Sequence, residues 1–357
     1  MSAEQSCLQR CADLRLGRNN LFDLVRLYAA VQVLLVHGQV HLGLQWPSWL
    51  MQCFSLPGVP LFFSISGCLV GLSWLRLQSQ WRIYAWHRGL RIFPALWFCL
   101  LSTVLILIAA GKTGFLLSPQ GGLWLLAQAT VVQVFNPDGL RDIGVGVING
   151  SLWTIPVELQ FYAALPLLVQ LCTFRRNLLP AWTWLMLAGI LSYGCWLALP
   201  ALGQSSAWLE KFLRVSLIPH LFQFLLGFLV LPLLACFGRQ RTIMLLLGLA
   251  LALLVLQRYP HAPLPLLQPL LWSALPLGIG LIPCRSLHFP DLSYGLYLFH
   301  MPLVNVLLLL GLSGSASLMP YLGGAFVLAS VSWKFVEEPA LARKPTLGQT
   351  SSFTPMH

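Results

Sequence analysis

An arginine and a histidine interrupt the first long apolar run of the sequence. Arg26 and His37 stand eleven positions apart near residues 24–42. In an α-helix this spacing returns to within about 20° of the same face and separates the two side chains by roughly 16 Å along the axis. Ionisable groups inside an apolar helix are costly to bury, so each is a candidate for a functional site. A snorkelling arginine and a packed histidine are the plain alternatives.

Two arginines open a later apolar run at helical spacing. Arg88 and Arg91 stand three residues apart, ahead of Pro94, and therefore share one helix face. Cations are unfavourable at a helix N-terminus, and a bound anion would relieve that cost while using the free backbone N–H groups. Guanidinium groups suit phosphate. The pair predicts a phosphate site, and charge that only marks the cytoplasmic side of a membrane is an equally good explanation.

Glu158 is the only acidic residue well inside an expected membrane span. It follows Pro156 near the start of a helix, where the macrodipole favours a carboxylate. If this helix starts on the outer side, Glu158 lies at a depth similar to that of His37, and the two side chains could meet in an outward-facing cavity. A helix-start acid without a chemical role is the alternative.

A further histidine, His300, lies in an apolar run one helical turn after Tyr297 and two residues before Pro302. A hydrogen bond to a backbone carbonyl that Pro302 leaves free explains it at least as well as catalysis does. We therefore assign His300 and Tyr297 a structural or site-supporting role. His220 is a weaker candidate, and the Glu337-Glu338-Pro339 segment is most simply an interfacial helix end.

The composition shows which elements must position these residues. Hydrophobic residues make up 57% and charged residues 9% of the 357 positions, whereas a soluble domain carries about 25% charged residues. So few charges cannot cover a surface in water. The net charge of +11 comes from basic residues in short loops, which favours membrane topology over nucleic-acid binding. The sequence therefore predicts an all-α, polytopic transmembrane bundle in contact with the lipid bilayer.

We expect about ten spans, since a transmembrane helix needs about 20 apolar residues. They lie near residues 24–42, 56–75, 89–110, 153–173, 180–200, 214–237, 241–257, 266–283, 291–311 and 317–336. Residues 121–135 are apolar but short. We predict a re-entrant or interfacial segment there, because a span would move the later basic loops to the outer side.

Loop charge gives the expected orientation. The positive-inside rule places the more basic side, and with it both termini, in the cytoplasm. That side carries Arg10, Arg15, Arg18, Arg76, Arg82, Arg88, Arg91, Arg175, Arg176, Arg239, Arg241, Arg285, Arg343 and Lys344. We expect a cytoplasmic segment over residues 1–18, a transmembrane domain over 19–343 and a disordered cytoplasmic tail over 344–357. The nine cysteines show no zinc-ligand spacing, and no metal is expected.

Five segments, taken in order, resemble acyltransferase family 3, a group of bacterial membrane O-acyltransferases. The segments are the Arg26 and His37 pair, the Gly58–Gly67 stretch, Arg88 and Arg91 ahead of Pro94, the Ser151–Tyr162 stretch through Glu158, and the Ser293–Pro302 stretch through Tyr297 and His300. The resemblance covers about residues 19–343. Each segment alone is weak evidence, but all five in this order make a specific match.

The resemblance implies an enzyme of the bacterial inner membrane. It would move an acyl group of the acetyl or succinyl class from a cytoplasmic donor to a hydroxyl of a cell-envelope glycan, a lipid-linked sugar or a small molecule. The donor would be an acyl-coenzyme A such as acetyl-coenzyme A, used as a co-substrate, with no tightly bound cofactor.

Joined to the residues above, this gives a mechanistic hypothesis. Arg88 and Arg91, with Arg26, hold the donor phosphates. His37 is the general base or a covalent relay, and Glu158 orients the imidazole or positions the acceptor. The rival class is a transporter or flippase of a glycan or lipid without covalent chemistry, because buried ionisable residues also mark transport pathways. That class leaves the arginine pair without a purpose.

Overall fold

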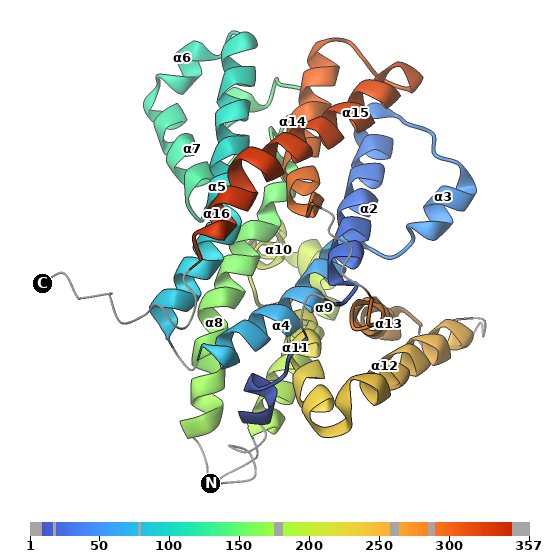
Figure 1. Cartoon of the computed structure of the whole chain (residues 1–357). Helices are drawn as coiled ribbons and strands as arrows, with labels where there is room; N and C mark the ends of the chain where they lie inside the picture. The colour runs from blue at the N-terminus through green and yellow to red at the C-terminus, as the bar shows by residue number, and fades with distance from the viewer. Residues whose placement is uncertain are drawn as a thin grey trace, which may run out of the picture.

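Helices form at every position where an apolar run predicts one. The computed structural model describes residues 9–16, 19–77, 80–174, 181–257, 264–284 and 290–344, and these residues form helices and loops but no strand (Figure 1). The all-α fold class is confirmed. Some of the residues behind the orientation and domain predictions lie outside the described residues. These are residues 1–8, Arg18, Arg175, Arg176, Arg285 and the tail beyond Lys344.

The elements follow one another along the chain without any internal repeat. They are α2 (Phe22–Leu42), α3 (Ser48–Cys53), α4 (Gly58–Arg76), α5 (Trp81–Ala109), α6 (Thr113–Leu116), α7 (Pro119–Ala129), the 3-10 turns η1 (Asp138–Leu140) and η2 (Gly150–Trp153), α8 (Thr154–Phe174), α9 (Ala181–Ser205), α10 (Ala207–Arg214), α11 (Leu221–Phe228), α12 (Val230–Leu256), α13 (Leu264–Gly280), α14 (Ser293–Leu309), α15 (Ser315–Ser332), the π-helical turn η3 (Trp333–Glu337) and α16 (Glu338–Ala342).

Six helical stretches of the described residues are long and apolar enough to cross a membrane. They are Ser48–Arg76, Trp81–Ala109, Gly150–Gln170, Thr183–Ser205, Leu221–Leu256 and Ser315–Ala342. The apolar helices α13 and α14 are shorter. The chain therefore has the character of a membrane protein, but the expected count of about ten spans is not confirmed.

The helix boundaries differ from the expected spans in one region. A single span over residues 214–237 is expected, but α10 ends at Arg214 and α11 begins only at Leu221. The helix α12 then runs through residue 237 and is kinked at Gly238, which has a φ of 74°. A glycine adopts this left-handed conformation without a steric penalty. The expected boundary between two spans is therefore a kink within one helix.

The ambiguous segment at residues 121–135 forms the short helix α7 and part of the loop that follows it. Its 11 residues are too few to span a bilayer. The hydroxyl of Ser118 caps its first turn by accepting from the Gly121 N–H at 3.1 Å. Trp124 is buried against Leu107 at the end of α5, so α6 and α7 cover that end of the long helix (Figure 1).

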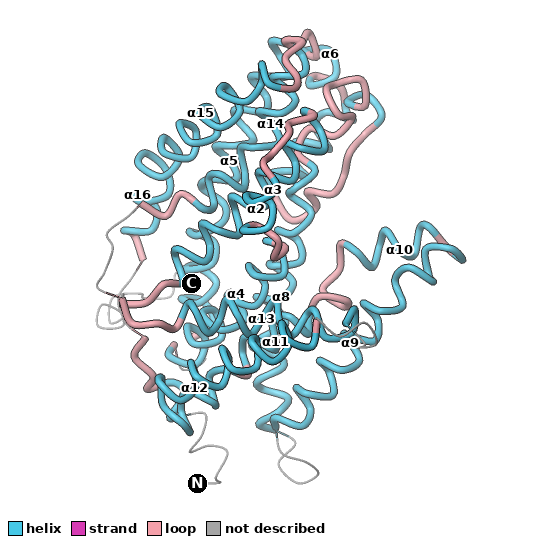
Figure 2. Tube along the Cα trace, turned by 90° about the vertical axis from the view of Figure 1, so that its right-hand side faces the viewer, coloured by secondary structure: helices cyan, strands magenta, loops and turns pink. Residues whose placement is uncertain are grey.

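The helices fall into two groups in both views. One group contains α2, α5, α14 and α15, and the other contains α4, α11, α12 and α13 (Figures 1 and 2). The close crossing of α4 and α11 depends on glycine, because a Cβ at Gly67 would lie 1.9 Å from the Phe224 carbonyl oxygen and one at Gly227 would lie 1.9 Å from that of Ser64. Small residues allow such close backbone approach in membrane helices.

Candidate active site

Two histidines far apart in the sequence meet between α2 and α14. Nε2 of His300 lies 3.0 Å from Nδ1 of His37, and the ring centroids are 4.9 Å apart. His300 is fully buried, whereas His37 is only partly buried. Met301 places its sulfur 3.0 Å from the same nitrogen of His37. The structure therefore gives the expected catalytic residue His37 a histidine partner.

The hydrogen bonds decide which ring nitrogens carry protons. Nδ1 of His300 lies 3.2 Å from the Leu296 carbonyl oxygen, which can only accept, so this nitrogen is the donor. Without an acidic partner among the described residues, a buried imidazole stays neutral. Nε2 of His300 is then an acceptor, and Nδ1–H of His37 donates to it. Nε2 of His37 keeps its lone pair, and no described residue donates a hydrogen bond to it.

Pro302 has a different effect from the expected one. A proline within a helix removes the hydrogen bond to the carbonyl four residues earlier, which here belongs to Leu298. The side-chain amide of Asn149 donates to that carbonyl at 2.8 Å, and the Cys99 thiol approaches it at 3.4 Å. The expectation that His300 serves the carbonyl freed by Pro302 is therefore wrong, because Asn149 already satisfies it.

Glu158 lies apart from the histidine pair. Its Oε1 accepts hydrogen bonds from the Ser66 hydroxyl at 3.0 Å and from the Tyr162 hydroxyl, one turn later on α8. The structure describes both Glu158 and His37, and no hydrogen bond or ion pair joins them. Similar depth along two helices does not ensure that the side chains point toward each other, and here they do not.

Glu158 instead lines a cavity of 260 Å³, which we call the arginine pocket. Its polar lining comes from α2, α4, α5, α8, α14 and the chain end after α16. These residues are Arg26, Ser66, Arg88, Arg91, Thr154, Glu158, Tyr162, Ser293, Tyr294, Tyr297 and Lys344. The structure therefore brings all three arginines of the expected donor site to one cavity.

Arg91 and Arg26 share a carboxylate that the sequence analysis did not single out. Nη2 of Arg91 lies 2.6 Å from Oδ2 of Asp291, and Nη1 of Arg26 lies 3.9 Å from the same oxygen. The Ser293 hydroxyl donates to the other carboxylate oxygen of Asp291 at 2.5 Å. Asp291 lies two residues before the first residue of α14, and its Oδ1 also accepts from the Ser293 N–H at 3.3 Å. An acidic residue close to a helix start is a typical capping signal, so this position could have indicated Asp291 from the sequence.

Arg88 is held differently, since no carboxylate of a described residue lies within ion-pair distance of it. Its Nη2 lies 3.4 Å from the Ser73 hydroxyl, and its guanidinium carbon lies 5.9 Å from the Tyr84 ring centre and 5.7 Å from that of Tyr162. Its Nε is buried without a hydrogen-bond partner in the described chain. Because an unsatisfied buried donor is costly, Arg88 is well prepared to bind an anion.

The turn η3 corrects the interpretation of the Glu337-Glu338-Pro339 segment. Glu338 is exposed, as an interfacial helix end requires, but Glu337 is only 3% exposed and accepts from the Ser332 hydroxyl at 2.9 Å. The wider π-helical turn changes the direction in which residue 337 points. A carboxylate that a regular helix pattern assigns to the surface is therefore inside the protein.

Lys344 is a further cation that the sequence analysis left in the tail. It lines the arginine pocket immediately after α16. Burial, together with the positive charges of Arg88, Arg91 and Arg26, lowers the pKa of the Lys344 ammonium to about 8. A bound anion would reverse the electrostatic part of that effect.

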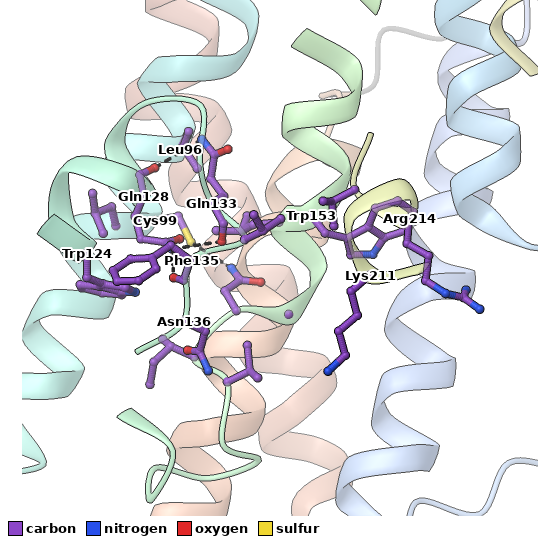
Figure 3. Close-up of a pocket in the computed structure, with 18 of the residues that line it drawn as sticks. Leu96, Cys99, Trp124, Gln128, Gln133, Phe135, Asn136, Trp153, Lys211 and Arg214 are labelled. Atoms are coloured by element: carbon purple, nitrogen blue, oxygen red, sulfur yellow. Dashed lines mark hydrogen bonds between the residues drawn. The ribbon is translucent and has the colours of Figure 1, made fainter. Parts of the chain in front are cut away.

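A second cavity of 520 Å³ lies farther along α5 (Figure 3), and we call it the tryptophan cavity. On α5, Ile92 lines the arginine pocket, and Leu96, one turn later, lines the tryptophan cavity. Where η2 meets α8, Thr154 lines the arginine pocket and Trp153 lines the tryptophan cavity. Aromatic, amide and basic side chains line it, among them Trp124, Gln128, Gln133, Phe135, Trp153 and Lys211. The two cavities are therefore neighbours along the chain, and we call the protein between them the partition.

Tyr297 belongs to that partition. Its hydroxyl donates to the Ser151 carbonyl at 2.6 Å and lies 2.6 Å from the Thr154 hydroxyl. Its ring centre is 6.0 Å from that of His300, one turn later on α14. His37 is not among the lining residues of either cavity. The histidine pair therefore adjoins the partition through Tyr297.

Comparisons with known proteins agree with the expected resemblance. A family model described as an acyltransferase domain matches residues 19–336. The chain is similar to Nodulation protein 10 of Rhizobium leguminosarum bv. viciae, with 30% identity over 93% of this chain and 95% of that protein. It is also similar to an O-acetyl transferase of Shigella phage Sf6, with 32% identity over 41% of this chain and 44% of that protein. No solved structure matches significantly.

Proposed function

This chain belongs to the acyltransferase family whose model spans most of it, and from that membership we propose the reaction, its donor and its acceptor. The protein is an O-acyltransferase that moves an acetyl- or succinyl-class group from a cytoplasmic acyl-coenzyme A to a hydroxyl of a cell-envelope glycan, a lipid-linked sugar or a small molecule. It crosses the bacterial inner membrane about ten times, with both termini in the cytoplasm. The contact between Nδ1 of His37 and Nε2 of His300 is the observation that carries the proposal, because it assigns the proton of His37 to Nδ1 and leaves Nε2 as the base.

The arginine pocket receives the donor. Arg88, with its unpaired Nε, and Lys344 supply positive charge that is not bound to a carboxylate within the described chain. Arg91 and Arg26 add charge but are partly neutralised by Asp291. Phosphate groups accept strong charge-assisted hydrogen bonds from such cations. With the phosphates there, the acyl-bearing arm of the donor extends toward Tyr297 and the histidine pair.

His37 activates the acceptor hydroxyl. Its Nε2 takes the hydroxyl proton while the oxygen attacks the thioester carbonyl, so a C–O bond forms as the C–S bond breaks. The leaving thiolate then recovers the proton from the imidazolium. His300 acts as a positioning residue, because its bond to Nδ1 fixes the tautomer that exposes Nε2. A covalent route, in which Nε2 first carries the acyl group, would use the same nitrogen.

Glu158 acts at the donor end in this scheme. Its carboxylate accepts a hydrogen bond from the Tyr162 hydroxyl, and the Tyr162 ring centre lies 5.7 Å from the guanidinium carbon of Arg88, within cation–π distance. The negative charge of Glu158 also balances part of the positive charge that the arginines and Lys344 bring to the pocket. Glu158 therefore positions Arg88 rather than His37.

The test is a deletion strain complemented with the unmodified protein or with His37→Ala. Envelope glycans are analysed for O-acyl groups by mass spectrometry, and donor affinity is measured on the purified proteins. We expect the substitution to lower transfer by about two to four orders of magnitude, as loss of a general base does, with donor affinity unchanged. His41→Ala, which alters a neighbouring ring on the same helix, is the control. Parental acylation by the His37 variant would refute the assigned chemistry.

A further inference from the structure

The tryptophan cavity has the size and walls of a ligand site. Its 520 Å³ falls within the roughly 300–1,000 Å³ typical of such sites. Trp124, Trp153 and Phe135 line it from three different segments (Figure 3). Aromatic rings offer broad apolar faces beside a polar edge, and the C–H faces of sugar rings are their natural counterpart.

Gln133, which belongs to the wall of this cavity, holds a buried acceptor without a partner in the described chain. The side chain of Gln133 is 4% exposed, and its Oε1 has no hydrogen-bond partner among the described residues. Its Nε2 is occupied, since it donates to the Thr130 carbonyl at 2.5 Å. Gln128 holds the loop in place by donating to the carbonyls of Gln133 and Phe135, each at 3.1 Å. A buried acceptor in a fixed loop calls for a donor, and a ligand hydroxyl can supply it.

The charged side chains that line the tryptophan cavity are all basic. Lys211 and Arg214 line it and no carboxylate does. Arg214 is paired with Glu210 at 2.6 Å, and its guanidinium points away from the other labelled side chains (Figure 3). Lys211 extends toward the Asn136 side of the cavity (Figure 3) and has no ion-pair partner among the described residues. The exposed ammonium at the rim therefore favours a negatively charged ligand.

We propose that the tryptophan cavity binds the acceptor and that the acceptor is an anionic glycan. The proposal rests on the acyltransferase function proposed above. Sugar rings lie on the aromatic walls, a hydroxyl donates to Oε1 of Gln133, and a phosphate or carboxylate pairs with Lys211. The donor phosphates then lie in the arginine pocket and the body of the acceptor in the tryptophan cavity, and for transfer the thioester and the acceptor hydroxyl extend past Tyr297 to Nε2 of His37, which lines neither cavity. Separate pockets would let either substrate bind without the other.

Two matched pairs of variants test the site. Leu100→Trp fills the cavity from α5, whereas Leu101→Trp places the same bulk on the outer side of that helix, at a residue that is 57% exposed. Lys211→Gln removes the charge at the rim without touching buried packing, and Arg141→Gln removes an exposed cation that is paired with Asp138 elsewhere. Each variant is measured in the full-length protein for acetyl-coenzyme A affinity and for acylation of envelope glycans.

We expect Leu100→Trp to lower acylation by about tenfold or more while donor affinity stays within about twofold. Lys211→Gln should raise the apparent KM for the glycan by about tenfold, as loss of a charge-assisted contact does, and the difference should shrink at high salt. Both controls should behave like the unmodified protein. Parental acylation by Leu100→Trp, or a loss of donor affinity in it, overturns the proposal. If Leu100→Trp fails to fold, an unchanged KM in Lys211→Gln overturns it instead.

The anionic group is identified with labelled donor. Proteoliposomes receive [14C]acetyl-coenzyme A and one of three envelope fractions: lipid-linked saccharide diphosphates, acidic polysaccharide or neutral polysaccharide. Label in the first assigns the charge to phosphate and label in the second assigns it to carboxylate, and either supports the site. Label only in the neutral fraction overturns it. If the unmodified protein neither binds the donor nor labels any fraction, the acyltransferase proposal itself has failed, which the variants alone would not show.

Discussion

The arginine pocket and the tryptophan cavity are lined by successive parts of α5 but hold their polar groups in opposite ways. In the arginine pocket, charged groups from distant parts of the chain neutralise one another, as Asp291 does for Arg91 and Arg26. In the tryptophan cavity, the buried polar groups are neutral amides such as Gln128 and Gln133, and the charge of Lys211 stays at the rim.

The difference shows how desolvation shapes each site. A charge taken out of water is very costly unless it is paired, so the arginine pocket depends on partners supplied by several helices. A neutral amide needs only a local hydrogen bond, and in the tryptophan cavity Gln128 and Gln133 make theirs to carbonyls within a few residues of themselves. Substitutions in the first region should therefore affect the whole protein, and those in the second should affect mainly the bound ligand.

The largest effect is expected for Asp291→Asn. It leaves Arg91 without its carboxylate partner, whereas Arg26 keeps Asp23 at 2.9 Å. Breaking a fully buried ion pair costs about 3–5 kcal/mol, and because this pair is partly buried we expect a loss of stability at the lower end of that range. Denaturant unfolding in detergent measures the change. Asp142→Asn is the control, because Asp142 is exposed in its pair with Lys112 and such pairs contribute about 0–1 kcal/mol. If the two variants are equally stable, the Asp291 pair contributes no more to stability than the exposed Asp142 pair, and the proposed difference between them is refuted.

An intermediate effect is expected for Arg88→Ala. Arg88 has no carboxylate partner among the described residues, so its loss should weaken acetyl-coenzyme A binding by about 1.5–3 kcal/mol and leave stability nearly unchanged. Arg91→Ala should instead lose stability as well, because it removes the nearer cation of Asp291 and leaves only Arg26, at 3.9 Å. Donor affinity at fixed salt and unfolding in detergent separate the two. Arg82→Ala, an exposed cation on the same helix, is the control, and unchanged affinity in Arg88→Ala would end the donor assignment.

The smallest effect concerns pH. The pKa of Lys344 is about 8 in the free protein, and a bound phosphate would raise it. Below pH 8 the ammonium is charged with or without donor, so affinity is constant. As pH rises through 8 the free form loses its proton and binding must restore it, so affinity should fall about threefold between pH 7.5 and 8.5. Lys344→Arg stays charged and should show no such fall. The same pH profile in both proteins would exclude Lys344 from donor binding.

The sequence indicated most of the candidate residues because the free-energy cost of placing an ionisable side chain in an apolar helix can be recognised from the neighbouring residues alone. A run of apolar residues predicts a helix, and an ionisable group within that run is costly wherever the helix packs, so Arg26, His37 and Glu158 were identified without any structure. Helical spacing also placed Arg88 and Arg91 on one face, and all three arginines do line one cavity. The roles assigned to these residues stay predictions.

The partners of these residues were decided only by tertiary structure. Helical periodicity fixes which face of one helix a side chain occupies, but not which helix lies opposite that face. His37 therefore could not be matched with His300, nor Arg91 with Asp291, until α2, α5 and α14 were packed together. Similar depth suggested a pairing of His37 with Glu158, but depth carries no information about direction around the helix axis. Long-range packing supplies that direction, because hydrogen bonds and ion pairs form only between groups that it brings within a few ångströms.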